Sequence, residues 1–338
     1  MKIKIGDITK IRTGKLDANA ADENGQYPFF TCSKELLKIN TYSYDCECVL
    51  VAGNGDLNVK YYNGKFDAYQ RTYIIEDDSD GLLFMPYLYF FMESYIDELR
   101  KQSIGGVIKY IKLKNLTDAL IELPSIEVQR KIVNIISKSK EIVRRKENEF
   151  ELLDELVRAR FVEMFGEIED CDKWESKIWN EVVTIKNGRD YKKVLVSDGG
   201  YPVVGTGGEI ARASKYLCPE NTIVVGRKGS INNPMLMKEK FWNVDTAFGV
   251  IPNSDYLHYQ YFYCFCKFYN FMKLNKATTL PSTTKADLLK IRINIPPLEL
   301  QNQFASFVQE IDKSRSRIQK SLEASQELFD SLMQEYFG

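Results

Sequence analysis

The sequence contains a single histidine, and this scarcity excludes most chemistry that depends on imidazole. His258 stands beside tyrosines in an aromatic stretch, where a packing or surface role is the ordinary expectation. Serine–histidine and cysteine–histidine catalytic pairs, and metal sites built on several imidazoles, are therefore not expected in this chain.

The seven cysteines lack the spacing of a metal site. Cys46 and Cys48 are separated by one residue, as are Cys264 and Cys266, whereas zinc sites commonly use a C-x-x-C pair. The second pair lies in the aromatic run YQYFYCFCKFYNF, where cysteine behaves as a small buried hydrophobic residue. We therefore expect these thiols to pack in a core, and we expect no metal ion.

Long apolar runs are also missing. No run approaches the roughly 18 residues that span a bilayer. The start of the chain, MKIKIGDITKI, alternates like a β-strand and has no apolar signal-peptide core, so we expect a cytoplasmic protein. At 338 residues, with 44% hydrophobic and 28% charged residues, the chain is long enough for two domains with ordinary cores.

What the sequence does contain is an internal repeat. The segment LPSIEVQRKI, which begins at Leu123, resembles IPPLELQNQF, which begins at Ile295. Both lead into a long amphipathic stretch that closes on Phe-Gly. Upstream, YPFFT resembles YPVVG and VLVAGNGD resembles IVVGRKGS, with an offset of about 172 to 174 residues throughout. One globular domain followed by one long helix is therefore predicted to occur twice.

Each globular half is predicted to be α/β with much strand. Short β-branched and aromatic runs, such as ECVLVAG and NTIVVG, are separated by Gly, Asn and Asp. An aromatic helix follows in each half, then a Gly- or Thr-rich loop, and then a last strand that leads to the proline.

The long segments are predicted to be helices over residues 127–165 and 299–337. About 39 residues of helix extend roughly 58 Å, and such a helix cannot bury an apolar stripe alone. We therefore expect the two helices to pair antiparallel, with one globular domain at each end and a pseudo-two-fold axis. Apolar residues recur with the period near 3.5 that is typical of a coiled coil, and they include Ile132, Ile135, Ile136, Ile142, Val143, Leu156, Val157, Phe304, Val308, Leu328 and Phe329.

Together these segments resemble the specificity subunits of type I restriction-modification systems over essentially the whole chain. VAGNGDLNVKYYNGKFDAYQRTYI and VVGRKGSINNPMLMKEKFWNVDTAFGV are similar to parts of the family's target recognition domains, and TTLPSTTKADLLKI to the loop and strand that close one. The resemblance implies an α/β fold with two pseudo-repeated target recognition domains, residues 1–123 and 167–295. Two long antiparallel coiled-coil helices, residues 124–166 and 296–338, separate them.

The resemblance also implies a function without catalysis. Each recognition domain is expected to read one half of a bipartite, asymmetric site in double-stranded DNA. The helices are expected to set the spacer and to dock methyltransferase subunits, two in number, which restriction/translocase subunits then join. No cofactor is expected in this chain, because S-adenosylmethionine and ATP belong to the partner subunits, and no membrane partner is expected.

Charge is unevenly distributed for a DNA-binding protein. The whole chain has a net charge of -1. Residues 1–123 have 15 basic and 18 acidic residues, whereas residues 167–295 have 18 basic and 14 acidic residues, so only the second domain is mildly basic. Affinity for DNA grows with the number of phosphates neutralised. We therefore expect weak binding by the isolated chain, with partner subunits supplying much of the affinity.

The candidate DNA contacts lie in loops. Glycines after buried strands let the backbone approach phosphate closely, Arg and Lys bind phosphate or guanine edges, and Asn pairs with adenine. An ordinary solvated loop residue is the alternative for each candidate. In the first half the candidates are Gly53, Asn54, Gly55, Tyr69, Gln70, Arg71, Thr72, Gly105, Gly106, Lys109 and Tyr110. In the second half they are Gly207, Arg227, Lys228, Gly229, Ser230, Asn232, Thr246, Thr279, Ser282 and Lys285.

Enzyme motifs are not found. GTGGE at residues 205–209 lacks the Lys-Ser/Thr ending of a phosphate-binding loop. NNPM at residues 232–235 lacks the second proline and the stacking aromatic of amino-methyltransferase motifs. The main alternative is a two-domain coiled-coil scaffold that binds protein without sequence-specific DNA recognition. In that case substitutions in the helices matter and substitutions in the loops do not.

Overall fold

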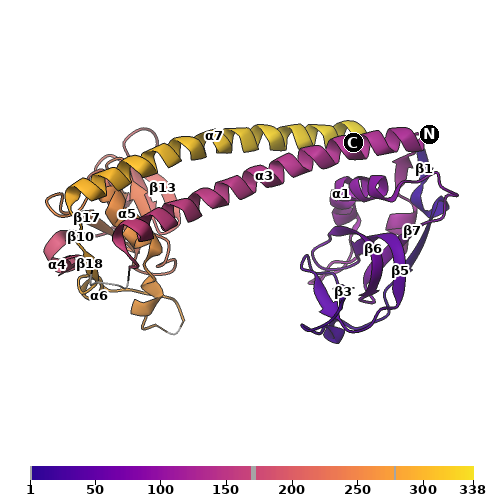
Figure 1. The fold of residues 1–338 in the computed structure, drawn as a ribbon, viewed down its shortest axis with the longest axis horizontal. Coiled ribbons are helices and arrows are strands. Elements are labelled where there is room, and N and C mark those ends of the chain that lie inside the picture. Colours follow the sequence, from indigo (N-terminus) through magenta and orange to yellow (C-terminus); the bar gives the residue numbers. More distant parts are fainter. Residues whose placement is uncertain (1, 169–172, 278) are drawn as a thin grey trace. The chain divides into compact units, whose positions relative to one another are not determined.

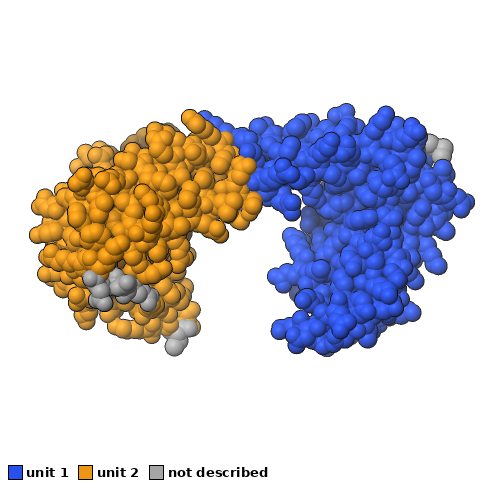
Figure 2. Space-filling view, in the orientation of Figure 1, with its two compact units in different colours: residues 1–147, 320–338 blue, residues 148–319 orange. Residues whose placement is uncertain are grey.

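The computed structural model describes residues 2–168, 173–277 and 279–338. The chain divides into two compact units (Figure 2). Unit 1 contains residues 1–147 and 320–338, and unit 2 contains residues 148–319. Each unit therefore combines one globular half, the beginning of the long helix that follows it, and the end of the other long helix.

Unit 1 is built on a six-stranded sheet. Its order is β2-β7-β5-β6-β3-β4, and neighbouring strands are antiparallel except for the parallel pair β3 and β6. A separate two-stranded ladder joins β1 to β8. The strands are β1 (Lys2–Lys4), β2 (Thr9–Thr13), β3 (Tyr27–Phe30), β4 (Leu37–Ile39), β5 (Tyr44–Ala52), β6 (Val59–Ala68), β7 (Thr72–Asp77) and β8 (Leu120–Glu122).

The core of unit 1 lies on both faces of β5. Val49 and Val51 pack with the aromatic helix α1 (Met85–Gln102), whereas Cys48 and Leu50 point to a smaller cluster around Phe66. Alternation of side chains along a strand explains this division, because every residue from 48 to 52 is buried. The short helix α2 (Leu113–Thr117) precedes the last strand, β8.

Unit 2 repeats this arrangement with a divided sheet. Its four-stranded sheets have the orders β10-β17-β14-β15 and β11-β13-β12-β16, and β9 pairs with β18 as β1 does with β8. Where unit 1 has the continuous strand β6, unit 2 has two short strands separated by residues 238–241. The strands are β9 (Ser176–Ile178), β10 (Val183–Asn187), β11 (Leu195–Val196), β12 (Tyr201–Gly205), β13 (Gly208–Ala213), β14 (Thr222–Gly226), β15 (Met235–Met237), β16 (Trp242–Asn243), β17 (Ala247–Pro252) and β18 (Arg292–Asn294).

The aromatic helix of unit 2 is shorter than its counterpart. Helix α5 (Tyr259–Phe268) is followed by a 3-10 turn, Phe271–Leu274. The side chain of Asn270 accepts a hydrogen bond from the N–H of Met272 at 3.0 Å, which starts the new turn. Two further short helices are α4 (Trp179–Val182) and α6 (Lys285–Leu288).

The long helices are confirmed, each beginning one residue earlier than predicted. They are α3 (Ile126–Phe165) and α7 (Leu298–Phe337), shown in magenta and yellow in Figure 1. Within unit 2 the rings of Phe161 and Phe304 lie 5.6 Å apart, and further along the helices Arg315 forms an ion pair with Asp154. Residue numbers rise on α7 as they fall on α3, so the two segments are antiparallel there, as predicted.

The predicted apolar stripe divides into two faces. Ile132, Ile136 and Val143 are buried in unit 1, whereas Ile135 and Ile142 are exposed. Apolar residues also stand at adjacent positions, as in Ile135–Ile136 and Ile142–Val143, so the stripe is wider than the narrow seam that one partner helix can bury and its outer members stay uncovered. Leu156 and Leu328 are exposed as well.

A buried glutamine fixes the beginning of each long helix to its own unit. Gln129 accepts a hydrogen bond from the N–H of Phe84 at 2.8 Å, and it donates to the carbonyls of Leu82 and Pro124 at 2.8 Å each. It is fully buried. These bonds explain why a glutamine occupies this place in the repeated linker.

The same three hydrogen bonds occur in unit 2. Gln301 accepts from the N–H of His258 at 2.8 Å and donates to the carbonyls of Tyr256 and Pro296 at 2.9 and 2.8 Å. Gln301 is also fully buried. The loop before the aromatic helix and the proline linker are thus tied to one side chain in both units.

Candidate nucleic-acid interface

Three loops predicted separately are hydrogen-bonded together in unit 1. The N–H of Gly53 donates to the carbonyl of Arg71 at 2.8 Å, and the N–H of Gly55 donates to the carbonyl of Lys109 at 2.9 Å. The N–H of Ile111 donates back to the carbonyl of Gly53 at 2.9 Å. We call this three-bond arrangement the loop clamp.

Unit 2 contains the same loop clamp. Arg227 donates from its N–H to the carbonyl of Thr246 at 2.8 Å, and Gly229 donates to the carbonyl of Pro281 at 2.9 Å. The N–H of Thr283 returns to the carbonyl of Arg227 at 3.0 Å. The repeat therefore extends to the backbone geometry of the loops, although most side chains differ.

Two glycines in the clamp have backbones that favour glycine. Gly55 and Gly229 have φ angles of +71° and +83°, in the left-handed region. A side chain at either position would meet no atom within 4 Å. Glycine is therefore favoured at both positions by the backbone conformation and not by lack of space. Both turns lie open on the side where another molecule could approach.

Exposed cations surround the clamp without acidic partners. Arg71, Lys109 and Lys228 are exposed and form no ion pair with any residue that the structure describes. The nearby carboxylate of Asp56 is paired with Lys34 at 3.1 Å, and this hydrogen bond holds its pKa below the ordinary value. The acid in this loop is thus neutralised, whereas the cations remain available to an anion.

Arg227 is held more firmly than the other cations. Its Nη1 donates to the carbonyl of Asp245 at 3.3 Å, and its guanidinium lies 6.0 Å from the centre of the Phe248 ring. This orientation leaves donors free for a phosphate or a guanine edge.

Three predicted contacts also form hydrogen bonds within their own unit. Thr72 is buried, and its hydroxyl donates to the carbonyl of Phe30 at 3.3 Å. The Asn232 amide oxygen accepts from the N–H of Phe271 at 2.8 Å, and the Lys285 amine donates to the carbonyl of Ile185 at 2.9 Å. Each of these side chains holds two distant segments of its own unit together. Thr72 is buried, whereas Asn232 and Lys285 are exposed and stay predicted contacts.

The remaining candidates differ in their exposure and in their contacts. Asn54 and Tyr110 form an isolated bridge, and so do Lys228 and Ser282. Gly53 is buried with both backbone groups hydrogen-bonded. The predicted Thr-rich loop of unit 2 begins at Thr278, and this residue lies outside the described residues. The exposed or half-exposed candidates are Tyr69, Gln70, Gly105, Gly106, Gly207, Ser230, Thr246 and Thr279.

The sequence did not predict a hollow in unit 1 where three cations gather with one acid, Glu93. A cavity of about 320 Å³ is lined in part by Lys34, Lys60 and Arg100. Burial lowers the pKa of the Lys60 amine, which donates to the carbonyl of Ser33 at 2.6 Å. These cations come from a loop, a strand and a helix, so no local sequence pattern could have revealed the group.

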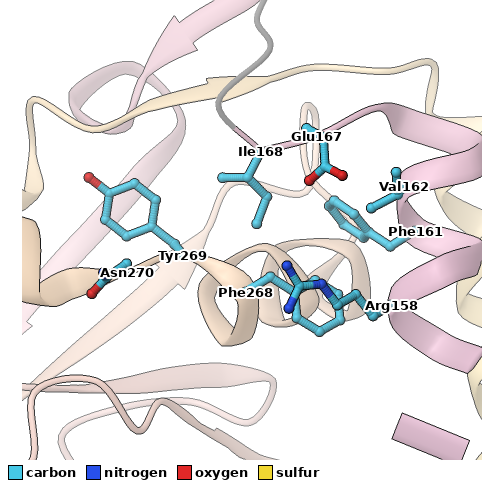
Figure 3. Close-up of a pocket in the computed structure, with 8 residues that line it drawn as sticks. All are labelled: Arg158, Phe161, Val162, Glu167, Ile168, Phe268, Tyr269 and Asn270. Atoms are coloured by element: carbon cyan, nitrogen blue, oxygen red, sulfur yellow. The ribbon is translucent and has the colours of Figure 1, made fainter. Parts of the chain in front are cut away.

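Unit 2 has a cavity of another kind (Figure 3). It measures about 250 Å³, and Phe161, Phe268 and Tyr269 line it together with Arg158 and Glu167. Among the described parts of the chain, no three His, Cys, Asp or Glu residues are grouped to hold a metal ion. Val162, Ile168 and Asn270 complete the lining, so the cavity combines apolar and polar surface with one cation and one acid.

The histidine and the cysteine pair of unit 2 have the packing roles predicted for them. His258 caps α5, where its Nδ1 accepts from the N–H of Gln260 at 3.1 Å, and burial lowers its pKa. Cys264 and Cys266 are buried in the main core of the unit, and burial raises the pKa of the Cys264 thiol to about 12. Over the described residues, the structure also has no helix that is both long and apolar enough to cross a membrane.

These features define a class of protein in which one α/β module, with its loop clamp and glutamine-anchored long helix, occurs twice. Residues 1–152 and 171–326 match the family model described as Type I restriction modification DNA specificity domain. The chain belongs to this family.

Comparison with curated proteins gives relatives of the same kind. The chain is 45% identical over 123 residues to the type I restriction enzyme EcoDI specificity subunit of Escherichia coli, a match that spans 36% of this chain and 27% of that protein. It is 22% identical to the MjaVIII specificity subunit of Methanocaldococcus jannaschii over an alignment that covers 94% of this chain and 89% of the relative.

Solved structures support the fold. The S subunit of a type I restriction-modification system from M. genitalium superposes with a TM-score of 0.69 at 16% identity, covering 100% of this chain and 96% of that one. A structure concerned with complex assembly and conformational transition of the type I R-M system gives a TM-score of 0.59 at 14% identity, covering 100% and 97%. At these identities the likeness concerns the fold alone.

Proposed function

We propose that this chain is the DNA-recognition subunit of a type I restriction-modification complex, in which each unit reads one half of a bipartite site. The observation that carries the proposal is the loop clamp, repeated with equivalent hydrogen bonds in both units. It presents exposed cations and open glycine turns at the surface. Groups of these kinds bind phosphates and base edges in other DNA-binding proteins. No catalytic role is assigned to the chain.

The partners are proposed from the long helices. Val128, Ile135 and Ile142 follow one another at seven-residue intervals on α3 and are exposed in unit 1. Leu152 and Leu156 are exposed on the part of α3 in unit 2. Such a row is suited to helices of another protein, and we assign it to methyltransferase subunits, two because the module occurs twice. Restriction/translocase subunits would join them, and the complex would work in the cytoplasm.

The experiment is to co-express the chain with its neighbouring methyltransferase subunit and to map methylated adenines across the host genome. The expected result is a split motif with a fixed spacer that disappears when this chain is omitted. Arg71→Ala should weaken methylation through the first half-site only, and Lys228→Ala through the second only. Each good base contact contributes roughly 1–3 kcal/mol of discrimination.

A matched control separates loop contacts from general charge. Lys2→Ala removes one exposed cation from β1, where the amine lies 3.8 Å from Glu122 and outside the loops. This variant should methylate as wild type does. If Lys2→Ala and Arg71→Ala behave alike while the complex assembles normally, the assignment of the clamp to DNA is wrong.

The scaffold hypothesis makes the opposite prediction. Ile142→Asp places a charge on the exposed row of α3 and should abolish co-purification with the methyltransferase subunit under either hypothesis. Only under the scaffold hypothesis do all loop variants leave the methylated motif unchanged. The two sets of variants therefore distinguish a DNA reader from a protein-binding spacer.

A further inference from the structure

In each loop clamp a large, exposed aliphatic residue immediately precedes the residue whose carbonyl accepts the glycine N–H; in unit 1 the neighbouring Val107 is exposed as well. Ile108 is 63% exposed and immediately precedes Lys109, whose carbonyl is bound by Gly55. Leu280 is 54% exposed and immediately precedes Pro281, whose carbonyl is bound by Gly229. The same backbone bond thus follows an exposed aliphatic residue in both units.

These side chains are carried by backbone that is held in place. In unit 1 the loop closes on itself, because Ile104 and Tyr110 exchange backbone hydrogen bonds of 3.0 and 2.9 Å. In unit 2 the Asn275 amide oxygen accepts from the N–H groups of Ala277 and Ser282 at 3.1 and 3.0 Å. These bonds restrain described backbone near Ile108 and near Leu280, so the exposure of both side chains follows from the fold.

The surroundings of the two side chains indicate what covers them. Lys109 adjoins Ile108, and Lys228 is bridged to Ser282 two residues beyond Leu280. Both lysines are exposed and have no ion-pair partner among the described residues. Double-stranded DNA offers anionic phosphates close to apolar groups, namely thymine methyls and the faces of unstacked bases. The charge therefore favours DNA over an apolar protein surface as the occupant.

We propose that Ile108 and Leu280 are specificity-determining residues that make an apolar contact with a base, one in each half-site. This inference rests on the proposed function, and it names a contact that depends on base identity and not on phosphate charge. The shared chemistry is apolar contact with a base, which is supplied either by a thymine methyl or by the face of a base opened from its stack.

Two control residues match the proposed contacts in exposure. Leu82 is 62% exposed in unit 1 and Leu195 is 54% exposed in unit 2, and neither lies in a clamp loop. The variants Ile108→Ala and Leu280→Ala are therefore compared with Leu82→Ala and Leu195→Ala, respectively. All four remove an exposed aliphatic group, so each should unfold within a few degrees of the wild-type protein.

The measurement is binding of the complex with its methyltransferase subunit to a duplex that carries the mapped motif, and to a duplex without it. Ile108→Ala and Leu280→Ala should each weaken binding to the motif by about 5- to 30-fold, while binding to the other duplex stays unchanged because no charge is lost. The two controls should bind the motif within about twofold of wild type.

Two further measurements identify the apolar group. If it is a thymine methyl, replacing one thymine of the half-site by uracil weakens wild-type binding but not binding by the Ala variant. If it is an unstacked base, 2-aminopurine in the half-site brightens on binding to the wild-type complex and not to the variant. Either result supports the proposal, and the absence of both overturns it.

The inference and the proposed function fail in different ways. A genome without any split methylation motif in the presence of an assembled complex rejects both. If a motif is found, and Ile108→Ala and Leu280→Ala bind it as tightly as their controls do, only the apolar contact is rejected. Equal weakening of binding to both duplexes also rejects the apolar contact, because losing a contact with a base cannot lower affinity for DNA that lacks this base.

Discussion

The buried glutamine of unit 2 allows a prediction whose size follows from the structure. Gln301→Met keeps the length and approximate volume of the side chain but removes one acceptor and both donor contacts. The His258 N–H and the Tyr256 and Pro296 carbonyls then lose hydrogen bonds of 2.8, 2.9 and 2.8 Å inside the protein. A buried polar group without a partner costs about 1–3 kcal/mol, so the loss of all three bonds should destabilise the variant by about 3–9 kcal/mol.

The effect is large because a domain is typically stable by only about 5–15 kcal/mol. For a unit of this size each kcal/mol shifts the melting temperature by roughly 2–4 °C, so the expected shift is on the order of 10 °C. The sequence has three tryptophans, Trp174, Trp179 and Trp242, and all lie in unit 2. Tryptophan fluorescence during urea unfolding therefore reports unit 2, and circular dichroism reports both units.

Two variants provide the controls. Gln129→Met removes the equivalent hydrogen bonds from unit 1, so it should shift the circular dichroism transition and leave the fluorescence transition in place. Gln326 is exposed on α7, where its amide donates to Asp330 at 2.8 Å, and Gln326→Met should change stability by less than about 0.5 kcal/mol. If the fluorescence midpoint of Gln301→Met moves no further than that of Gln326→Met, the glutamine does not anchor the helix.

Three other predictions concern single positions. Gly55→Ala should destabilise unit 1 by about 1–2 kcal/mol because its φ is +71°, whereas Gly106→Ala, also in open space but without a positive φ, should change urea stability by less than about 0.5 kcal/mol. Phe165→Ala should lower the free energy of unfolding by about 3–5 kcal/mol, as fluorescence can measure. The pseudo-equivalent Phe337→Ala should lower it less, as circular dichroism can measure, because Phe337 is only half-buried. Equal losses of stability would contradict this prediction. Burial raises the pKa of the Cys264 thiol to about 12. At pH 8 this thiol should therefore be alkylated only after the half-buried thiols of unit 1, as peptide mass spectrometry can measure. Early labelling of Cys264 would refute its burial.

Periodicity and repeat matching predicted the helices well because both signals can be read directly from the order of residues in the chain. The long helices begin within one residue of the predicted positions, and Gly55 and Gly229 lie where the aligned strands end. The faces of the helices were harder to predict. A period near 3.5 cannot show which of Ile135 and Ile136 meets the partner helix, because adjacent residues differ by only about 100° around the axis.

The roles of individual loop residues could not be predicted, for a different reason. Thr72, Asn232 and Lys285 have the polarity expected of DNA contacts. Their side chains also bond to Phe30, Phe271 and Ile185, each at least 39 positions away in the chain. Tertiary folding alone brings these pairs together. A polar loop residue therefore shows its role only when the hydrogen-bond partners of its side chain are known.

The loop clamp explains how two copies of one module can diverge without losing their geometry. All three of its hydrogen bonds join backbone groups, so the acceptor residue can be Arg71 in one unit and Thr246 in the other. Lys109 and Pro281 can likewise replace one another, since only their carbonyls are used. Even the divided strand of unit 2 leaves the clamp intact. Side chains at the surface are thus free to change while the backbone that presents them is kept, and we infer that this freedom lets the two half-sites differ.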